Sequence, residues 1–175
     1  RKESSAASDV YKRQILPISK PFGDFTPDTD GEGPIVLLSA GVGITPMISA
    51  LNRIAYVAPQ RRVIFAHAAR NAQHHPHRAD IAKAIELMPN LHSVTFYEEG
   101  ASGQDSVPGR MQLKQLPQWD VQNAKVYLCG PLPFMQAQWA DLIASGVPPH
   151  NLHREVFGPD PVSYTHLTLP TTPYV

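Results

Sequence analysis

Residues 37–47 have the sequence Leu37-Leu38-Ser39-Ala40-Gly41-Val42-Gly43-Ile44-Thr45-Pro46-Met47, and this stretch decides the predicted fold. Residues 35–38 are all apolar, which is typical of a parallel strand buried on both faces. Two glycines then allow the backbone a close approach that a Cβ atom would obstruct. Thr45 suits a helix N-cap and Pro46 the first helical position. The amides that follow, from Met47 on, favour an anion, so the stretch predicts a seat for a phosphate or pyrophosphate.

This glycine turn differs from two common phosphate-binding motifs. A P-loop needs a lysine before its Ser or Thr, and none is present here, which argues against ATP or GTP hydrolysis. The standard dinucleotide fingerprint needs a third glycine where Pro46 stands. A tight strand-to-helix turn without any ligand is the alternative that the residues leave open.

Composition narrows the class of protein. The chain has 175 residues, enough for one domain with a core, and its 15 basic and 15 acidic residues argue against a nucleic-acid partner. A single cysteine excludes a disulfide framework within the chain. No apolar run approaches the roughly 18 residues of a membrane helix, and no signal peptide is visible, so a cytoplasmic domain without membrane contact is expected.

The two ends of the chain differ from its middle. Residues 1–14 and 162–175 show neither helical periodicity nor turn chemistry that would join them to a core. Both resemble translated adapter sequence, and we expect them to be non-native tails; natural disordered tails are the alternative.

The middle of the chain alternates strand and helix patterns. Strands are predicted at residues 35–38, 63–66, 92–97, 125–128 and 152–157, separated by helices or loops. A polar loop is expected over residues 98–107, and a short helical piece from Gly109 to Pro117. The alternation predicts an α/β fold with a five-stranded parallel sheet, right-handed crossovers and helices on both faces.

Unusual residues follow four of the predicted strands. They are Gly41-Val42-Gly43, the segment 67–71, Cys129-Gly130-Pro131 and Phe157-Gly158. Because the carboxyl ends of parallel strands share one edge of the sheet, these residues are expected to line one binding crevice.

Four motifs carry a resemblance to a known family. They are Ser39 to Met47, His67-Ala68-Ala69-Arg70, Tyr127-Leu128-Cys129-Gly130-Pro131 and Glu155-Val156-Phe157-Gly158-Pro159. In this order they resemble the C-terminal NAD-binding part of bacterial flavohaemoglobins, which are nitric oxide dioxygenases of the ferredoxin-reductase-like superfamily. The resemblance implies strand order 3-2-1-4-5. It also implies that residues 15–33 are the end of a flavin domain with its linker, and that residues 34–161 are the NAD-binding domain. From the residues alone, an ordinary loop with buried Phe22 and Phe25 is an equally compatible interpretation of residues 15–27.

The resemblance implies hydride transfer from NADH (or NADPH) to FAD, followed by electron transfer to haem for nitric oxide dioxygenation to nitrate. The FAD and globin domains would belong to the same full-length protein and are absent here, so this chain alone is expected to be inactive. The cofactor-binding residues implied are Gly41, Val42, Gly43, Ile44, Thr45, Pro46, His67, Arg70, Cys129, Gly130, Pro131, Val156, Phe157, Gly158 and Pro159.

Two residues are implied as catalytic. Cys129 would lie beside the nicotinamide, and a buried structural cysteine is the alternative. Glu155 would tune the flavin and haem potentials, and a solvated carboxylate on an edge strand is its alternative.

The sequence gives weaker indications on the choice between NADH and NADPH, and on metal binding, than on the fold. Arg70 favours a 2′-phosphate and Glu98-Glu99 disfavours it, so NADH is preferred only by family habit. The segment His74-His75-Pro76-His77 matches no zinc motif; we predict a solvated loop and no metal site.

Two other functions stay open: the reductase component of an iron–sulfur oxygenase, and a nucleotide-binding module without turnover.

Overall fold

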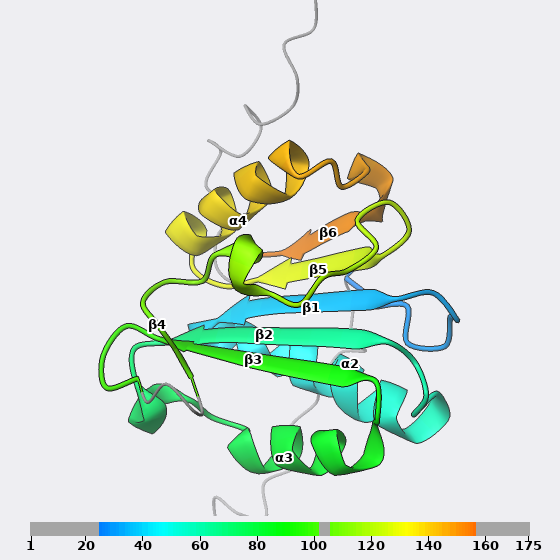
Figure 1. Cartoon of the computed structure of the whole chain (residues 1–175), viewed down its shortest axis with the longest axis horizontal. Coiled ribbons are helices and arrows are strands. Elements are labelled where there is room, and N and C mark those ends of the chain that lie inside the picture. The colour runs from blue at the N-terminus through cyan, green and yellow to red at the C-terminus, as the bar shows by residue number, and fades with distance from the viewer. Residues whose placement is uncertain (1–24, 102–105, 157–175) are drawn as a thin grey trace, which may run out of the picture.

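The computed structural model describes residues 25–101 and 106–156, and their strands form one parallel sheet (Figure 1). The strands are β1 (Ile35–Ala40), β2 (Val63–Ala69), β3 (Leu91–Tyr97), β4 (Val107–Pro108), β5 (Lys125–Cys129) and β6 (Leu152–Glu155). Their spatial order is β4-β3-β2-β1-β5-β6, and every pairing is parallel. The α/β fold and the predicted order of five strands are confirmed.

The sheet has one strand more than we predicted. The expected loop over residues 98–107 ends in the two-residue strand β4, which pairs with the end of β3. A two-residue strand has no alternation that sequence periodicity could detect, and its pairing with β3 makes it a strand.

Helices cover both faces of the sheet, as expected. They are α2 (Ile44–Val57), α3 (Arg78–Leu87) and α4 (Leu132–Ala144), with 3-10 turns η1 (Gly41–Gly43), η2 (Ala72–His74), η3 (Leu113–Gln115) and η4 (Pro149–Asn151). Every residue of β1 is buried: Ile35 and Leu37 pack with α2 and α3, whereas Val36 and Leu38 pack with α4. Figure 1 shows α2 passing behind the sheet.

The start of α2 differs from the prediction. The helix begins at Ile44 with Gly43 at its N-cap, because the glycine turn is itself a turn of 3-10 helix that continues into α2. Thr45 is therefore not the N-cap, and its hydroxyl donates to the Val42 carbonyl at 3.0 Å. Pro46 is the third helical residue, where an N–H is still not needed, while the amide of Met47 lies where helical pairing begins. The Met47 amide is therefore not one of the unpaired first-turn amides that the sequence predicted at this helix end.

The structure also decides two predicted helical features, one at residues 109–117 and one at Gly146. The helical piece expected between residues 109 and 117 is the single turn η3. The end of α4 at Gly146 is confirmed: Gly146 adopts φ 87°, its N–H donates to Ile143 at 3.0 Å, and the Val147 N–H donates to Leu142 at 3.1 Å. This pair of hydrogen bonds is a Schellman motif.

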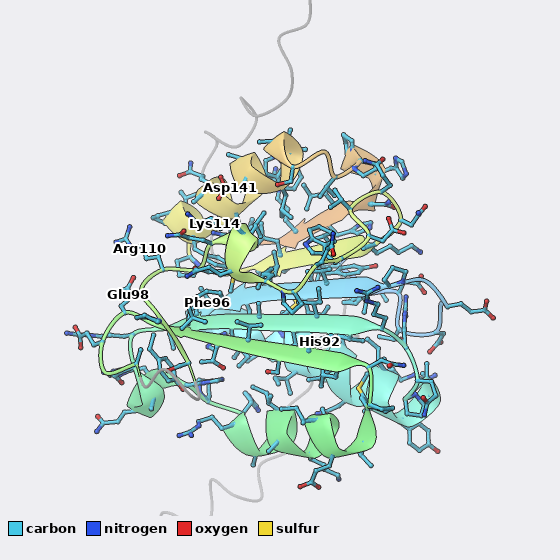
Figure 2. The ribbon with its side chains drawn as sticks, in the orientation of Figure 1. His92, Phe96, Glu98, Arg110, Lys114 and Asp141 are labelled. Atoms are coloured by element: carbon cyan, nitrogen blue, oxygen red, sulfur yellow. The ribbon has the colours of Figure 1, made fainter. Side chains whose placement is uncertain are left out.

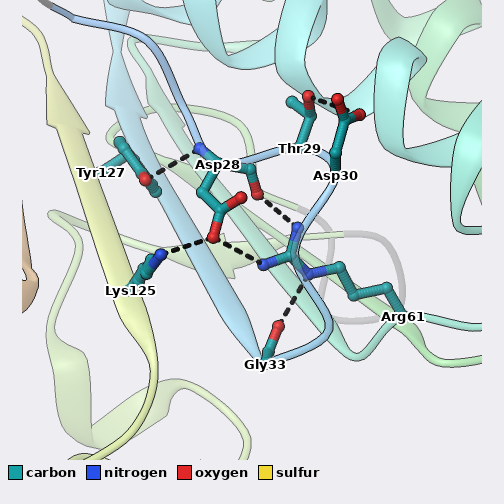
Figure 3. Close-up of polar contacts among 7 residues, drawn as sticks. All are labelled: Asp28, Thr29, Asp30, Gly33, Arg61, Lys125 and Tyr127. Carbon is teal, nitrogen blue, oxygen red and sulfur yellow. Dashed lines mark hydrogen bonds and ion pairs between the residues drawn. The ribbon is translucent and has the colours of Figure 1, made fainter.

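Residues 28–33 are tied to the amino-terminal end of the sheet (Figure 3). The buried Arg61 guanidinium donates to the backbone carbonyls of Asp28 and, at 2.7 Å, Gly33. Lys125 Nζ lies 2.5 Å from the Asp28 carboxylate, and this hydrogen bond lowers the pKa of Asp28 below its usual value. The Tyr127 hydroxyl accepts from the Asp28 N–H at 2.9 Å. These contacts hold the segment at the sheet end opposite to the strand carboxyl termini.

The predicted tails 1–14 and 162–175 lie outside the described residues. None of the helices in the described part of the chain has the length and apolar character needed to cross a membrane.

Candidate functional site

A cleft of about 760 Å³ opens at the carboxyl ends of the central strands. One wall comes from the turn after β1, with Gly41, Val42 and Thr45, and another from the end of β2, with Ala68, Ala69 and Arg70. A third wall comes from α4 and the residues just before it, including Pro131, Phe134 and Ala137. The predicted convergence of the strand ends on one crevice is therefore present for β1 and β2 and for the turn that follows β5.

The glycine turn packs tightly on the end of β5. Gly41 has φ 53°, a left-handed conformation that favours glycine. A Cβ atom on Gly43 would overlap the carbonyl of Cys129 and the amide of Gly130. The Ile44 N–H donates back to the carbonyls of Gly41 and Val42. The turn thus leads the chain from β1 directly into the first turn of α2, whose positive end is oriented as an anion seat requires.

Cys129 lies underneath this turn as the last residue of β5. It is fully buried and does not line the cleft. Burial, followed by the negative charge of Glu155, raises the pKa of its thiol to about 12. The thiol is therefore neutral at pH 7, which does not suit a nucleophile.

Glu155 occupies the last position of β6, in register with Cys129. Its side chain is half-buried and lies outside the cleft lining. The negative charge of Glu155 contributes to the raised pKa of the Cys129 thiol.

The structure separates the predicted cofactor residues into three groups. Those that line the cleft are Gly41, Val42, Ile44, Thr45, Arg70 and Pro131. Those that lie outside its lining are Gly43, Pro46, His67, Cys129, Gly130 and Val156. Phe157, Gly158 and Pro159 lie outside the described residues.

His67 is part of a buried polar pair below the cleft. Its Nδ1 lies 2.9 Å from the Ser39 hydroxyl, and its ring centroid lies 4.7 Å from that of His75. His75 Nδ1 in turn shares a hydrogen bond of 2.8 Å with the Tyr97 hydroxyl. Burial lowers the pKa of His67 to about 3 and that of His75 to about 4, so both rings are neutral at pH 7.

This pair changes the interpretation of the segment 74–77. We expected a solvated loop, but His75 is buried, since its hydrogen bond to Tyr97 anchors the segment to β3. The anchor holds the neighbouring His74, Pro76 and His77 in the cleft wall. Within the described ranges, no group of three or more His, Cys, Asp or Glu side chains could hold a metal ion.

Sequence reasoning missed the wall that follows β4. Arg110 and Met111 line the cleft, and the buried Gln138 amide donates to the Met111 carbonyl at 3.1 Å. Arg110 Nε lies 3.2 Å from Glu98 Oε1, and Figure 2 shows these two side chains beside one another at the end of the sheet. No sequence signal identified Arg110, because only the pairing of β4 with β3 brings it here.

Comparison with known proteins identifies the family. Residues 37–139 match the model of a family described as oxidoreductase NAD-binding domain. The chain belongs to this family. A flavohemoprotein of Bordetella pertussis is 41% identical over 155 residues, which cover 85% of this chain and 39% of that protein. A flavohemoprotein of Xylella fastidiosa is 37% identical, over 83% of this chain and 37% of that protein. This NAD-binding domain thus spans about two fifths of the length of these curated relatives.

Solved structures agree with this assignment. The flavohem-like FAD/NAD binding domain of nitric oxide dioxygenase from Vibrio cholerae has a TM-score of 0.72 at 34% identity, covering 79% of this chain and 56% of that one. A flavohemoglobin from Malassezia yamatoensis with bound FAD and heme has a TM-score of 0.71 at 26% identity, covering 86% and 40%. A ferredoxin NADP+ reductase from Neisseria gonorrhoeae, with a TM-score of 0.64 at 15% identity over 88% and 70%, shares the fold. The NAD-binding domain therefore has the predicted ferredoxin-reductase-like fold and resembles flavohaemoglobins.

Proposed function

We propose that this chain binds NADH in the cleft and presents the nicotinamide to an FAD held by another domain of the same protein. The observation that carries the proposal is the position of the cleft. In the sheet, β2, β3 and β4 lie on one side of β1, whereas β5 and β6 lie on its other side. The strand order therefore reverses between β1 and β5. The cleft lies at the carboxyl ends there, at the topological switch point where α/β sheets bind dinucleotides.

The proposed cofactor lies across this switch point. Its pyrophosphate occupies the positive end of α2, with the Thr45 side chain in the adjoining cleft wall. The adenosine extends toward the ends of β2 and β3, and the nicotinamide toward Pro131 and the end of β5. Cys129 supports the turn at that point as a small neutral side chain.

The proposed reaction is that of a flavohaemoglobin. The nicotinamide and FAD supply the hydride chemistry and haem the reaction of nitric oxide with oxygen to nitrate, while this chain binds and orients the dinucleotide. The similarity to flavohemoproteins supports this choice over an iron–sulfur reductase. Residues 34–161 are proposed as the NAD-binding domain and residues 15–33 as its connection to the flavin domain. The anchoring of Asp28 and Gly33 by Arg61 supports a fixed connection.

Roles toward the flavin are proposed for residues 155–159. Phe157 would lie against the flavin ring, bordered by Val156, Gly158 and Pro159. Glu155 would tune the flavin and haem potentials. The support is the resemblance of this segment to the flavohaemoglobin motif.

Titration of NADH into the 175-residue chain tests the proposed site. Replacement Ala137→Phe places a ring in the cleft wall and should weaken NADH binding by about tenfold or more, which is about 1.4 kcal/mol. The matched control Ala140→Phe makes the same change on the exposed part of α4 outside the cleft, and should leave the Kd unchanged. Failure of the unmodified chain to bind NADH would refute the proposal, and so would equal Kd values for the two variants.

A second experiment tests the reaction. The chain mixed with free FAD should oxidise NADH no faster than free FAD does, because the proposal assigns the binding of FAD to another domain of the protein. The protein with its flavin and globin domains should oxidise NADH and consume nitric oxide. An enzyme-like rate from the chain alone would contradict the proposal.

A further inference from the structure

We propose that Glu98 and Arg110 select the dinucleotide, favouring the free 2′-hydroxyl of NADH over the 2′-phosphate of NADPH. This inference rests on the proposed function, because it concerns the adenosine end of the same cleft. It adds a residue, Arg110, to which the sequence patterns gave no chemistry. It also decides between Arg70, which favours a 2′-phosphate, and Glu98-Glu99, which disfavours it.

The backbone places the glutamates at the cleft rim. Hydrogen bonding between β2 and β3 continues past the ends of both strands: the Glu98 N–H donates to Ala69 at 3.2 Å and the Glu99 N–H to Arg70 at 2.8 Å. Glu98 and Arg70 both line the cleft. Glu98 thus lies in the cleft lining just after β3, with Glu99 next to it, on the β2 side of the glycine turn, toward which the proposed adenosine extends.

Arg110 reaches the same rim from β4. Gly109 adopts φ 90° and donates its N–H to the Tyr97 carbonyl at 2.8 Å. This left-handed turn directs the chain from β4 back over the strand ends, and Arg110 lines the cleft there. Glu98 and Arg110 therefore meet from two different segments, as Figure 2 shows.

Each arginine at the rim is neutralised by a glutamate. Arg110 Nε lies 3.2 Å from Glu98, and Arg70 Nε lies 3.1 Å from Glu99. Within the part of the chain that the structure describes, each of these two arginine charges is thus balanced by a glutamate. A 2′-phosphate would have to displace Glu98 from Arg110 and lie close to its carboxylate, which like-charge repulsion opposes. A ribose diol meets no such repulsion, and its hydroxyls can donate to that carboxylate.

The same geometry predicts how the preference can be changed. The Glu98–Arg110 pair is exposed, and exposed pairs are weak and easily exchanged. Replacement Glu98→Gln removes the repelling charge and releases Arg110, whose guanidinium is suited to phosphate. Arg110 then becomes a ligand for the 2′-phosphate.

Titration of NADH and NADPH into the 175-residue chain measures the preference as a ratio of Kd values. The unmodified chain should prefer NADH. In Glu98→Gln the ratio Kd(NADPH)/Kd(NADH) should fall by about tenfold or more. The control Glu86→Gln makes the same charge change on an exposed position of α3 outside the cleft, and should change the ratio by less than about twofold.

A double variant tests whether Arg110 is the group released. Glu98→Gln combined with Arg110→Gln should lose most of the gain in NADPH affinity, whereas Glu98→Gln combined with Lys114→Gln should keep it. Lys114 is an exposed lysine on η3 outside the cleft. Thermal unfolding of each variant verifies that the fold is retained.

Three results would overturn the inference while leaving the proposed function intact, provided that NADH binds. They are a preference of the unmodified chain for NADPH, an equal change of ratio in Glu98→Gln and Glu86→Gln, and a gain that persists in Glu98→Gln/Arg110→Gln. If neither dinucleotide binds the unmodified chain, the proposed function and this inference both fail.

Discussion

The backbone of Gly43 lies directly against the carbonyl group of Cys129, with no room for a Cβ atom between them. This contact joins the turn after β1 to the last residue of β5. These two strands flank the point where the strand order reverses. The shape of the cleft therefore depends on a glycine at position 43.

Replacement Gly43→Ala should lower the free energy of unfolding by about 1–3 kcal/mol, because the methyl group must displace the Cys129–Gly130 peptide. The same displacement should weaken NADH binding. Gly33→Ala is the matched control: the nearest atom to a Cβ there is 3.9 Å away, so stability should change by less than about 0.5 kcal/mol. Urea unfolding of both variants measures the difference, and equal stabilities would contradict the prediction.

Replacement Arg61→Ala should destabilise the chain by about 2–3 kcal/mol, because the carbonyls of Asp28 and Gly33 lose their buried donor. Arg62 provides the control. It is exposed and donates to the Gln118 carbonyl at 2.7 Å, so Arg62→Ala should cost less than about 1 kcal/mol. Chemical denaturation compares the two, and a cost for Arg62→Ala as large as that for Arg61→Ala would show that burial of Arg61 is unimportant.

Acid should weaken the fold through the buried histidine pair. The pKa of His67 is lowered to about 3 and that of His75 to about 4, from a usual 6.5. The unfolded chain therefore takes up protons below pH 6.5 that the folded chain does not, and unfolding becomes easier as the pH falls toward 4. The limiting slope is about 1.4 kcal/mol per pH unit for each histidine.

The variant His75→Phe separates this contribution from general acid sensitivity. It keeps a ring beside His67 but cannot take up a proton, so the slope of unfolding free energy between pH 6 and pH 5 should decrease by up to about 1.4 kcal/mol per pH unit. His92→Gln, at an exposed position of β3, should leave the slope almost unchanged. An undiminished slope in His75→Phe would refute the assignment.

The thiol of Cys129 should be inert in the folded chain. Burial raises its pKa to about 12, and no part of its side chain is exposed. Reaction with a thiol reagent at pH 8 should therefore be slow in buffer and complete in denaturant. Rapid labelling without denaturant would mean that the end of β5 opens readily.

The sequence by itself determined the features that depend on neighbours along the chain. The apolar run in β1, the glycine turn and the alternation of strands with helices are local patterns, and together they predicted the sheet and the edge that carries the cleft. Gly41, Val42 and Thr45, which belong to this locally predicted turn, line the cleft.

Only the tertiary structure decided which distant side chains complete that wall. Glu98 and Arg110 are 12 residues apart and meet through the short strand β4, and His75 is held by Tyr97, 22 residues further on. Periodicity carries no information on such pairs, because their contacts arise from strand pairing and burial rather than from spacing along the chain. The same holds for Gly43: the sequence shows a turn glycine, but the Cys129 carbonyl that excludes a larger residue reaches it only when β1 and β5 pair.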